Sequence, residues 1–168
     1  MSAVATRNDP VLNQNFVISL LDSTSALSPS APPALTAILD GAAAGFSECS
    51  GLELTMQAEE YREGGNNAAV LKFAGRIAWS NVTLKRGISD RTDLWDWHFS
   101  FIEGRGKRRD GVIVLLDGSR HPRQAWYFRR GLPVKYSGPV LNAAQNSVAI
   151  EAIEIAHEGL QQIAGIGA

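Results

Sequence analysis

The sequence has little cysteine, little histidine and no excess of either charge. Its one cysteine, Cys49, excludes an intrachain disulfide. The three histidines, His98, His121 and His157, lack the spacing of metal ligands, so the sequence predicts no metal site. Lysine and arginine number 16 against 17 aspartate and glutamate residues, a formal net charge of -1. No global field therefore attracts the chain to nucleic acid or to an anionic membrane.

Long hydrophobic runs are also absent. No segment approaches the roughly 20 apolar residues of a membrane span, and the start, MSAVATRNDPVLNQNF, contains nothing typical of a signal peptide. We therefore expect synthesis in the cytoplasm and no membrane insertion, and leave open a release route that needs no signal peptide. The length fits a single domain over residues 1–168 with one core.

No arrangement of residues predicts catalysis. Glu59 and Glu60 are adjacent in an extended segment, so their carboxylates point to opposite faces and cannot act as an acid–base pair. No G-x-S-x-G stretch is present, and Cys49 within a strand is typical of a small apolar filler. We predict no catalytic residue, no cofactor and no enzymatic activity.

Alternating apolar residues indicate several β-strands. The clearest are residues 16–22, 45–63 and 71–88, and the second and third predict a long antiparallel hairpin around EEYREGGNN. Residues 112–138 predict another hairpin with its turn at DGSRHP. Residues 146–160 fit either a strand or a helix by pattern alone.

One segment has helical spacing, residues 89–104. Leu94, Trp97 and Phe101 recur on one face, Ser89 or Asp90 can cap the start, and Gly104 can end the helix. Strands around one helix predict a mainly antiparallel α+β domain, either a small barrel or two packed sheets.

The segment GRGKRRDG concentrates positive charge between the helix and the next strand. Its cations are Arg105, Lys107, Arg108 and Arg109, which permit contact with a polyanion. The spacing is not that of a phosphate-binding loop, and no aromatic residues alternate with the cations. A solvated connection is the favoured interpretation, with a nucleic-acid-binding module as the alternative.

Several strings, read in order, resemble one family. GFSECSGLE, YREGGNN, LKRGISD, LWDW, VIVLLD and GPVLNAAQNSVAIEAIEIAHEGL are similar to the tail-tube proteins of contractile bacteriophages and of phage-tail-like contractile injection systems, over about residues 7 to 160. The resemblance implies two packed antiparallel sheets approaching a β-barrel, one flanking α-helix, and mainly strand structure for the final segment.

The resemblance also implies a function and partners. Six copies would form a ring, and stacked rings would form the hollow inner tube that conducts cargo protein or DNA into a target cell. Its partners would be further copies of itself, the contractile sheath protein and the baseplate or spike complex. Assembly is expected in the bacterial cytoplasm, as part of a tail or tail-like particle whose extracellular release is left open. The alternative within the family is an initiator or adaptor ring that joins tube to baseplate spike.

Matching the family strings residue by residue gives candidate interface positions. The projecting loop, the LKRG strand end and the connection before the last segment are assigned to contacts between subunits or rings, whereas Trp95 and Trp97 of the helix are assigned to the core. The interface positions are Tyr61, Arg62, Glu63, Gly64, Gly65, Asn66, Lys85, Arg86, Gly87, Pro133, Lys135, Gly138, Pro139, Asn142 and Ala143.

Residues 23–44 form an Ala/Pro/Ser-rich insertion that is longer than the family pattern leads us to expect. We expect it to be peripheral, contacting sheath, baseplate or lumen, or to mark a specialised tube protein. Deleting it should then leave ring formation intact in electron micrographs of the purified protein. Loss of soluble folded protein on deletion would show instead that the insertion belongs to the core.

Overall fold

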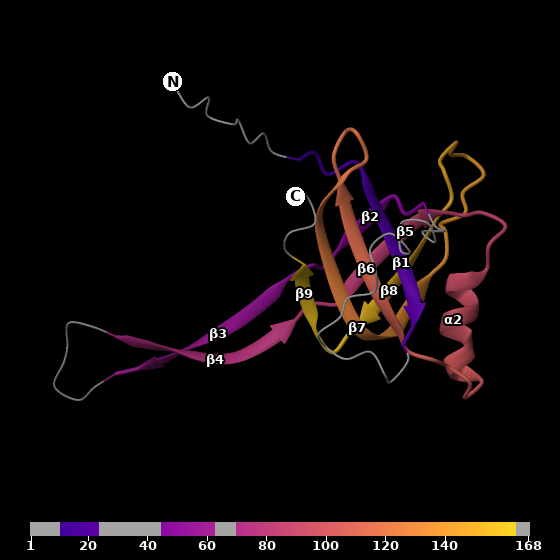
Figure 1. Ribbon diagram of the computed structural model, residues 1–168. Coiled ribbons are helices and arrows are strands. Elements are labelled where there is room, and N and C mark those ends of the chain that lie inside the picture. Colours follow the sequence, from indigo (N-terminus) through magenta and orange to yellow (C-terminus); the bar gives the residue numbers. More distant parts are fainter. Residues whose placement is uncertain (1–10, 24–44, 63–69, 164–168) are drawn as a thin grey trace, which may run out of the picture.

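The computed structural model describes residues 11–23, 45–62 and 70–163 (Figure 1). Within them the protein is mainly β, with two antiparallel sheets and one helix, as the sequence predicts. The strands are β1 Phe16–Asp22, β2 Glu48–Ser50, β3 Leu54–Tyr61, β4 Leu71–Trp79, β5 Val82–Gly87, β6 Arg109–Leu116, β7 Pro122–Ser137, β8 Ile150–Ala156 and β9 Leu160–Ile163, and helix α2 spans Asp93–Ile102.

The long strand β7 belongs to two layers. Its first half pairs with β6 on one side and with β9 on the other, while Leu132–Ser137 continues along β8. The change of layer falls at Arg130, which has a φ of 51°, and Gly131. The main sheet therefore runs β1-β6-β7-β8-β5-β2, with β9 attached to β7. No described pairing joins β1 to β2, so the two layers form an open sandwich and not a closed barrel.

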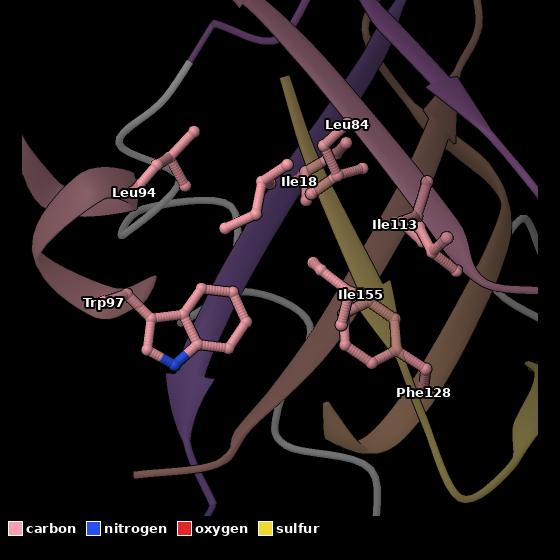
Figure 2. Close-up of a cluster of buried hydrophobic side chains, with 9 residues drawn as sticks. Ile18, Leu84, Leu94, Trp97, Ile113, Phe128 and Ile155 are labelled. Atoms are coloured by element: carbon pink, nitrogen blue, oxygen red, sulfur yellow. The ribbon is translucent and has the colours of Figure 1, made fainter. Parts of the chain in front are cut away.

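The core lies between the two layers and α2. Figure 2 shows Leu94 and Trp97 of α2 directed toward Ile18 of β1. The other buried members of this cluster are Val82, Leu84, Ile113, Phe128, Ile153 and Ile155. Strand alternation produces this arrangement: in β5 Val82, Leu84 and Arg86 are buried, while the residues between them are more accessible.

The predicted long hairpin is antiparallel, but each of its strands is interrupted. The first breaks at residues 51–53 and the second at 80–81, so that β2 and β5 belong to the main sheet while β3 and β4 form a separate two-stranded sheet. Gly51 explains the break, because its φ is +85° and a Cβ there would lie 1.9 Å from the Asn81 carbonyl oxygen.

Helix α2 begins later than the sequence predicts and ends where it predicts. Thr92, not Ser89 or Asp90, is the N-cap residue, because Asp93 at the first helical position is held by Arg86 of β5. At the other end the Arg105 N–H donates to the Ser100 carbonyl at 2.9 Å, and the Gly104 N–H donates to that of Phe101 at 3.2 Å. Gly104 has a φ of +72°, so the helix ends in a Schellman motif.

Two further expectations for secondary structure are confirmed, whereas residues 24–44 of the predicted insertion lie outside the described residues. Strands β6 and β7 form a hairpin whose turn is held by Asp117, which accepts hydrogen bonds from the backbone of Ser119 and His121. These hydrogen bonds lower the pKa of the Asp117 carboxyl, and the bond from the His121 N–H has the largest effect. The final segment forms β8 and β9, as the family resemblance implies.

Close packing at Gly111 gives a first test of this core. A Cβ at Gly111 would lie 2.1 Å from Cζ of Phe128, a ring with no exposed surface. We expect Gly111→Ala to lower the free energy of unfolding by about 1–3 kcal/mol through overpacking, measured by urea denaturation. Gly118→Ala is the matched control, because a Cβ there meets nothing within 4 Å. Equal stability of the two variants would contradict the packing described here.

Candidate subunit interface

The hairpin of β3 and β4, which we call the arm, projects away from the two-layered body (Figure 1). Every residue of β3 is exposed, and in β4 every residue except Gly75 is exposed. Leu54, Met56 and Phe73 each retain 55% of their accessible surface. Large apolar side chains at this density on a two-stranded ribbon are typical of a surface that another protein covers. The others on the arm are Tyr61, Leu71, Ile77 and Trp79.

The pairing register divides these side chains into two groups. At the base of the arm Leu54 lies opposite Trp79, and Met56 opposite Ile77. The register then shifts between Met56 and Ala58, where β4 has one extra residue. Beyond the shift Tyr61 lies opposite Leu71, and its ring meets that of Phe73 edge-on at 6.4 Å. The arm thus has an apolar base and an apolar tip, separated by a β-bulge.

The base of the arm is fixed to the body. The Ser80 N–H donates to the Glu53 carbonyl at 3.3 Å, and the carbonyl of Ser80 accepts a hydrogen bond from Nε2 of His157 at 3.0 Å. The His157 ring lies between Trp79 and Phe128, at centroid distances of 6.3 and 5.7 Å. Burial lowers the pKa of His157, so the ring is neutral at pH 7 and serves as a packing element.

The YREGG motif falls at the outer end of the arm. Tyr61 ends β3 and is 56% exposed, and Arg62 follows it on the surface. Both positions are accessible, which is compatible with the predicted contact. The other predicted residues of this loop, Glu63, Gly64, Gly65 and Asn66, lie outside the described residues.

The LKRG motif separates into exposed and buried positions. Lys85 points to the accessible face of β5 and pairs with Glu48 of β2, with 2.8 Å between Nζ and Oε1, while Gly87 pairs with Ile150. Arg86 is only 3% exposed. Its guanidinium is bound inside the subunit, and the predicted contact of Arg86 with a neighbouring copy stays a prediction.

Arg86 is the centre of a buried polar network. Its Nε donates to Oε1 of Glu151 at 2.6 Å, and its two terminal nitrogens donate to both oxygens of Asp93 at 2.7 and 3.2 Å. Tyr136 of β7 donates to the other oxygen of Glu151 at 2.7 Å. Burial opposes the charge on Arg86, but the hydrogen bonds that it donates to Asp93 and Glu151 outweigh this effect and raise the pKa of the guanidinium. The network joins β5, β7, β8 and the start of α2.

The two tryptophans of the helix do not share an environment. Trp97 is buried as predicted, and its Nε1 donates to the Lys107 carbonyl at 2.8 Å. Trp95 is 49% exposed, so its assignment to the core is wrong. It stacks on Phe99 at 5.9 Å and meets Tyr136 edge-on at 5.1 Å. The helical spacing allows only one of two neighbouring stripes to face the core.

The predicted interface positions at the end of β7 and in the connection after it include both buried and exposed residues. Pro133 is buried within the subunit, whereas Lys135 is exposed, and the predicted interface contacts of both stay predictions. Asn142 shapes the loop that follows, because its side-chain oxygen accepts from the Ala144 N–H at 3.0 Å. The loop presents Val140, which is 91% exposed, and Leu141. Gly138, Pro139 and Ala143 lie in the same accessible loop.

Carboxylates neutralise most of the basic segment. Arg105 pairs with Glu103, Arg108 with Glu158 at 3.1 Å, and Arg109 with Asp22 at 3.3 Å. Arg109 also lies over the ring of Trp97. The cations face separate acidic partners and do not form one continuous patch, with Lys107 alone lacking a described ion pair. This arrangement weakens the polyanion interpretation.

The described residues contain no feature that suggests catalysis. They hold no group of three His, Cys, Asp or Glu side chains that could bind a metal, and none of their helices is long and apolar enough to cross a membrane. Cys49 lines an apolar cavity of about 280 Å³ together with Phe16, Leu52 and Trp126. Burial, and secondarily Glu48, raises the pKa of its thiol to about 11, so it is not an activated nucleophile.

An exposed apolar arm on an open β sandwich is typical of a protein that assembles with others. The family model of the T4-like virus tail tube protein gp19 matches residues 12–161, and the chain belongs to that family. It is accordingly a structural protein of the tail-tube class, similar to the tubes of contractile injection systems. No curated protein sequence matches the chain.

Solved structures from contractile particles share the fold. A chain in the baseplate of the anti-feeding prophage has a TM-score of 0.76 at 22% identity, covering 94% of this chain and 97% of that one. A chain in the sheath-tube complex of the extracellular contractile injection system PVC has a TM-score of 0.76 at 21% identity, with coverages of 97% and 100%. A chain in the anti-feeding prophage cap has a TM-score of 0.75 at 19% identity, with coverages of 96% and 95%.

Two apolar surfaces were not predicted from the sequence. One is the arm, whose alternation indicates strands but does not indicate that both faces are exposed. The other is the outer face of α2, formed by Trp95, Phe99 and Ile102. Their spacing of four and three residues repeats that of the buried stripe. A helix with apolar residues on two faces is the signal that could have revealed this surface.

The Arg86 network gives a second test. We expect Arg86→Ala to lower the free energy of unfolding by about 3–5 kcal/mol, because it leaves the buried Glu151 carboxylate without a cation. The neighbouring Lys85→Ala removes an exposed ion pair and should cost no more than about 1 kcal/mol. Urea denaturation of the two variants measures the difference. A similar small loss in both would refute the structural role assigned to Arg86.

Proposed function

We propose that six copies of this chain close into a ring, and that the rings stack into the hollow inner tube of a contractile tail or injection system. Two unpaired strand edges support closure into a ring. The second layer consists of Leu132–Ser137 of β7 with β8, β5 and β2. Among the described residues, Leu132–Ser137 pairs only with β8 at one side of this layer, and β2 pairs only with β5 at the other. Pairing each of these edges with the opposite edge of the next copy leaves no edge of the second layer open.

The observation that carries this proposal is the arm. A chain that functions as a monomer would not keep seven large apolar side chains exposed on a projecting ribbon. In a ring the arm has a neighbour to cover it, and membership of the tail-tube family supplies the class of assembly. The partners that follow are the contractile sheath, the baseplate or spike, and a luminal cargo of protein or DNA.

The exposed loop after β7 supports stacking. Val140 and Leu141 project from it almost fully exposed, and Pro139, Asn142 and Ala143 surround them. An apolar loop tip at this accessibility suits a contact between rings. Assembly would take place in the bacterial cytoplasm, with the tube becoming part of a tail or tail-like particle.

Negative-stain electron microscopy with light scattering on the same sample tests the proposal. We expect rings whose mass is six times that of the chain, or tubes of stacked rings. Single rings that never stack at any concentration would favour the initiator or adaptor ring. A monomer over a wide range of concentration would refute both the tube and the initiator or adaptor ring. It would favour the alternative of a nucleic-acid-binding module that uses Lys107 and its neighbours.

A further inference from the structure

The outer face of α2 is an apolar surface that the subunit does not cover. Trp95, Phe99 and Ile102 lie along it, and Ile102 is 71% exposed. Trp95 and Phe99 are stacked with an angle of 15° between their rings, and Tyr136 of β7 supports Trp95 edge-on. The rings are therefore held in place before any partner arrives, which reduces the entropy lost on binding. We call this surface the helix stripe.

The helix stripe and the arm lie on opposite sides of the subunit. Figure 1 shows the arm extending to the lower left and α2 at the right of the body. A ring is closed by a heterologous interface, in which one side of each copy meets a different side of the next. Two apolar surfaces on opposite sides satisfy that requirement without meeting each other inside one subunit.

The strand edges bring the two surfaces together. Only residues 51–53 separate β2 from β3, so the base of the arm begins beside one edge of the second layer. Trp95 contacts Tyr136, so the helix stripe lies beside the other edge. If β2 of one copy adjoins Leu132–Ser137 of the next, the base of the first arm is carried toward the helix stripe of the second.

We propose that the helix stripe receives the base of the arm, formed by Leu54, Met56, Ile77 and Trp79, from the adjacent copy in the ring. This inference rests on the proposed ring. Charge supports the same pairing: no ion pair of Arg76, beside Ile77, is described within the subunit, whereas the open hollow at the start of α2 is lined by three carboxylates, Asp90, Asp93 and Asp96, against one cation, Arg91. The apolar groups cover each other while Arg76 faces carboxylates.

Cysteine cross-linking tests the contact in the full chain. In a Cys49→Ala background, Ile77→Cys and Ile102→Cys are introduced together and treated with a short bifunctional maleimide. Because each copy offers its arm to one neighbour and its helix to the other, the double variant should give a ladder reaching six subunits on a denaturing gel. Each single variant alone should stay monomeric, and a mixture of the two should stop at dimers.

Controls separate this inference from the proposed function. Ser119→Cys, in the exposed β6–β7 turn, replaces Ile102→Cys in a matched pair with Ile77→Cys and should give no ladder. Microscopy of the same samples shows whether rings are present. Rings without the ladder, or an equal ladder with Ser119→Cys, would overturn the arm-to-helix contact and leave the ring standing. Absence of rings would refute the proposed function itself.

Charge reversal gives an independent measurement. Arg76→Glu should weaken ring formation at low salt, seen as a shift to higher concentration in light scattering, and Asp90→Arg should restore it in the double variant. Arg123→Glu, whose partner is Asp117 within the same turn, is the control substitution and should not be rescued by Asp90→Arg. Failure of Asp90→Arg to restore assembly would contradict the proposed orientation of the arm.

Discussion

The bend of β7 is the constraint on which the rest of the structure depends. Because this strand pairs with β6 and β9 before Arg130 and continues along β8 after Gly131, one segment belongs to both layers. The layers are therefore packed face to face around Phe128 and Ile155, but the sheet is not closed between β1 and β2. The same bend leaves one side of Leu132–Ser137 without a strand partner in the described part of the chain. Packing inside the subunit and the open edge outside it thus have one origin.

Arg86 fixes the helix relative to the open edge. Its bonds to Glu151 and Asp93 join the second layer to the first turn of α2, and Tyr136 closes the network from the edge segment of β7. Trp95 then packs on the same Tyr136. An ion network of this kind contributes less net stability than its short distances suggest, because both charges lose their water. What it fixes is position, since the helix stripe and the strand edge are held in one geometry.

Much of the fold could be predicted from alternation and family motifs, whereas the interface could be predicted only in part. Leu84, Trp97 and Phe128 were recognisable as apolar positions because burial repeats with the period of a strand or helix. The burial of Arg86 could not be predicted, because the sequence does not show whether an arginine in a motif contacts solvent, a neighbouring subunit or a buried carboxylate. The assignment of Trp95 to the core was wrong for a related reason, because periodicity identifies two apolar stripes on the helix without indicating which of them faces the core. The break at Gly51 depends on its approach to Asn81, a contact between strands that a linear pattern does not contain.

The near-zero net charge of the chain is consistent with the exposed apolar arm and the open strand edges of the second layer. A protein that stays monomeric is helped by a net charge far from zero, because repulsion keeps copies apart. This chain has a formal net charge of -1 and pairs its basic segment internally, through Glu103, Glu158 and Asp22. In a stack of identical rings any excess charge would be repeated in every copy and would oppose growth. Near-neutrality, with apolar groups exposed on opposite sides, therefore favours dense assembly over a stable free monomer.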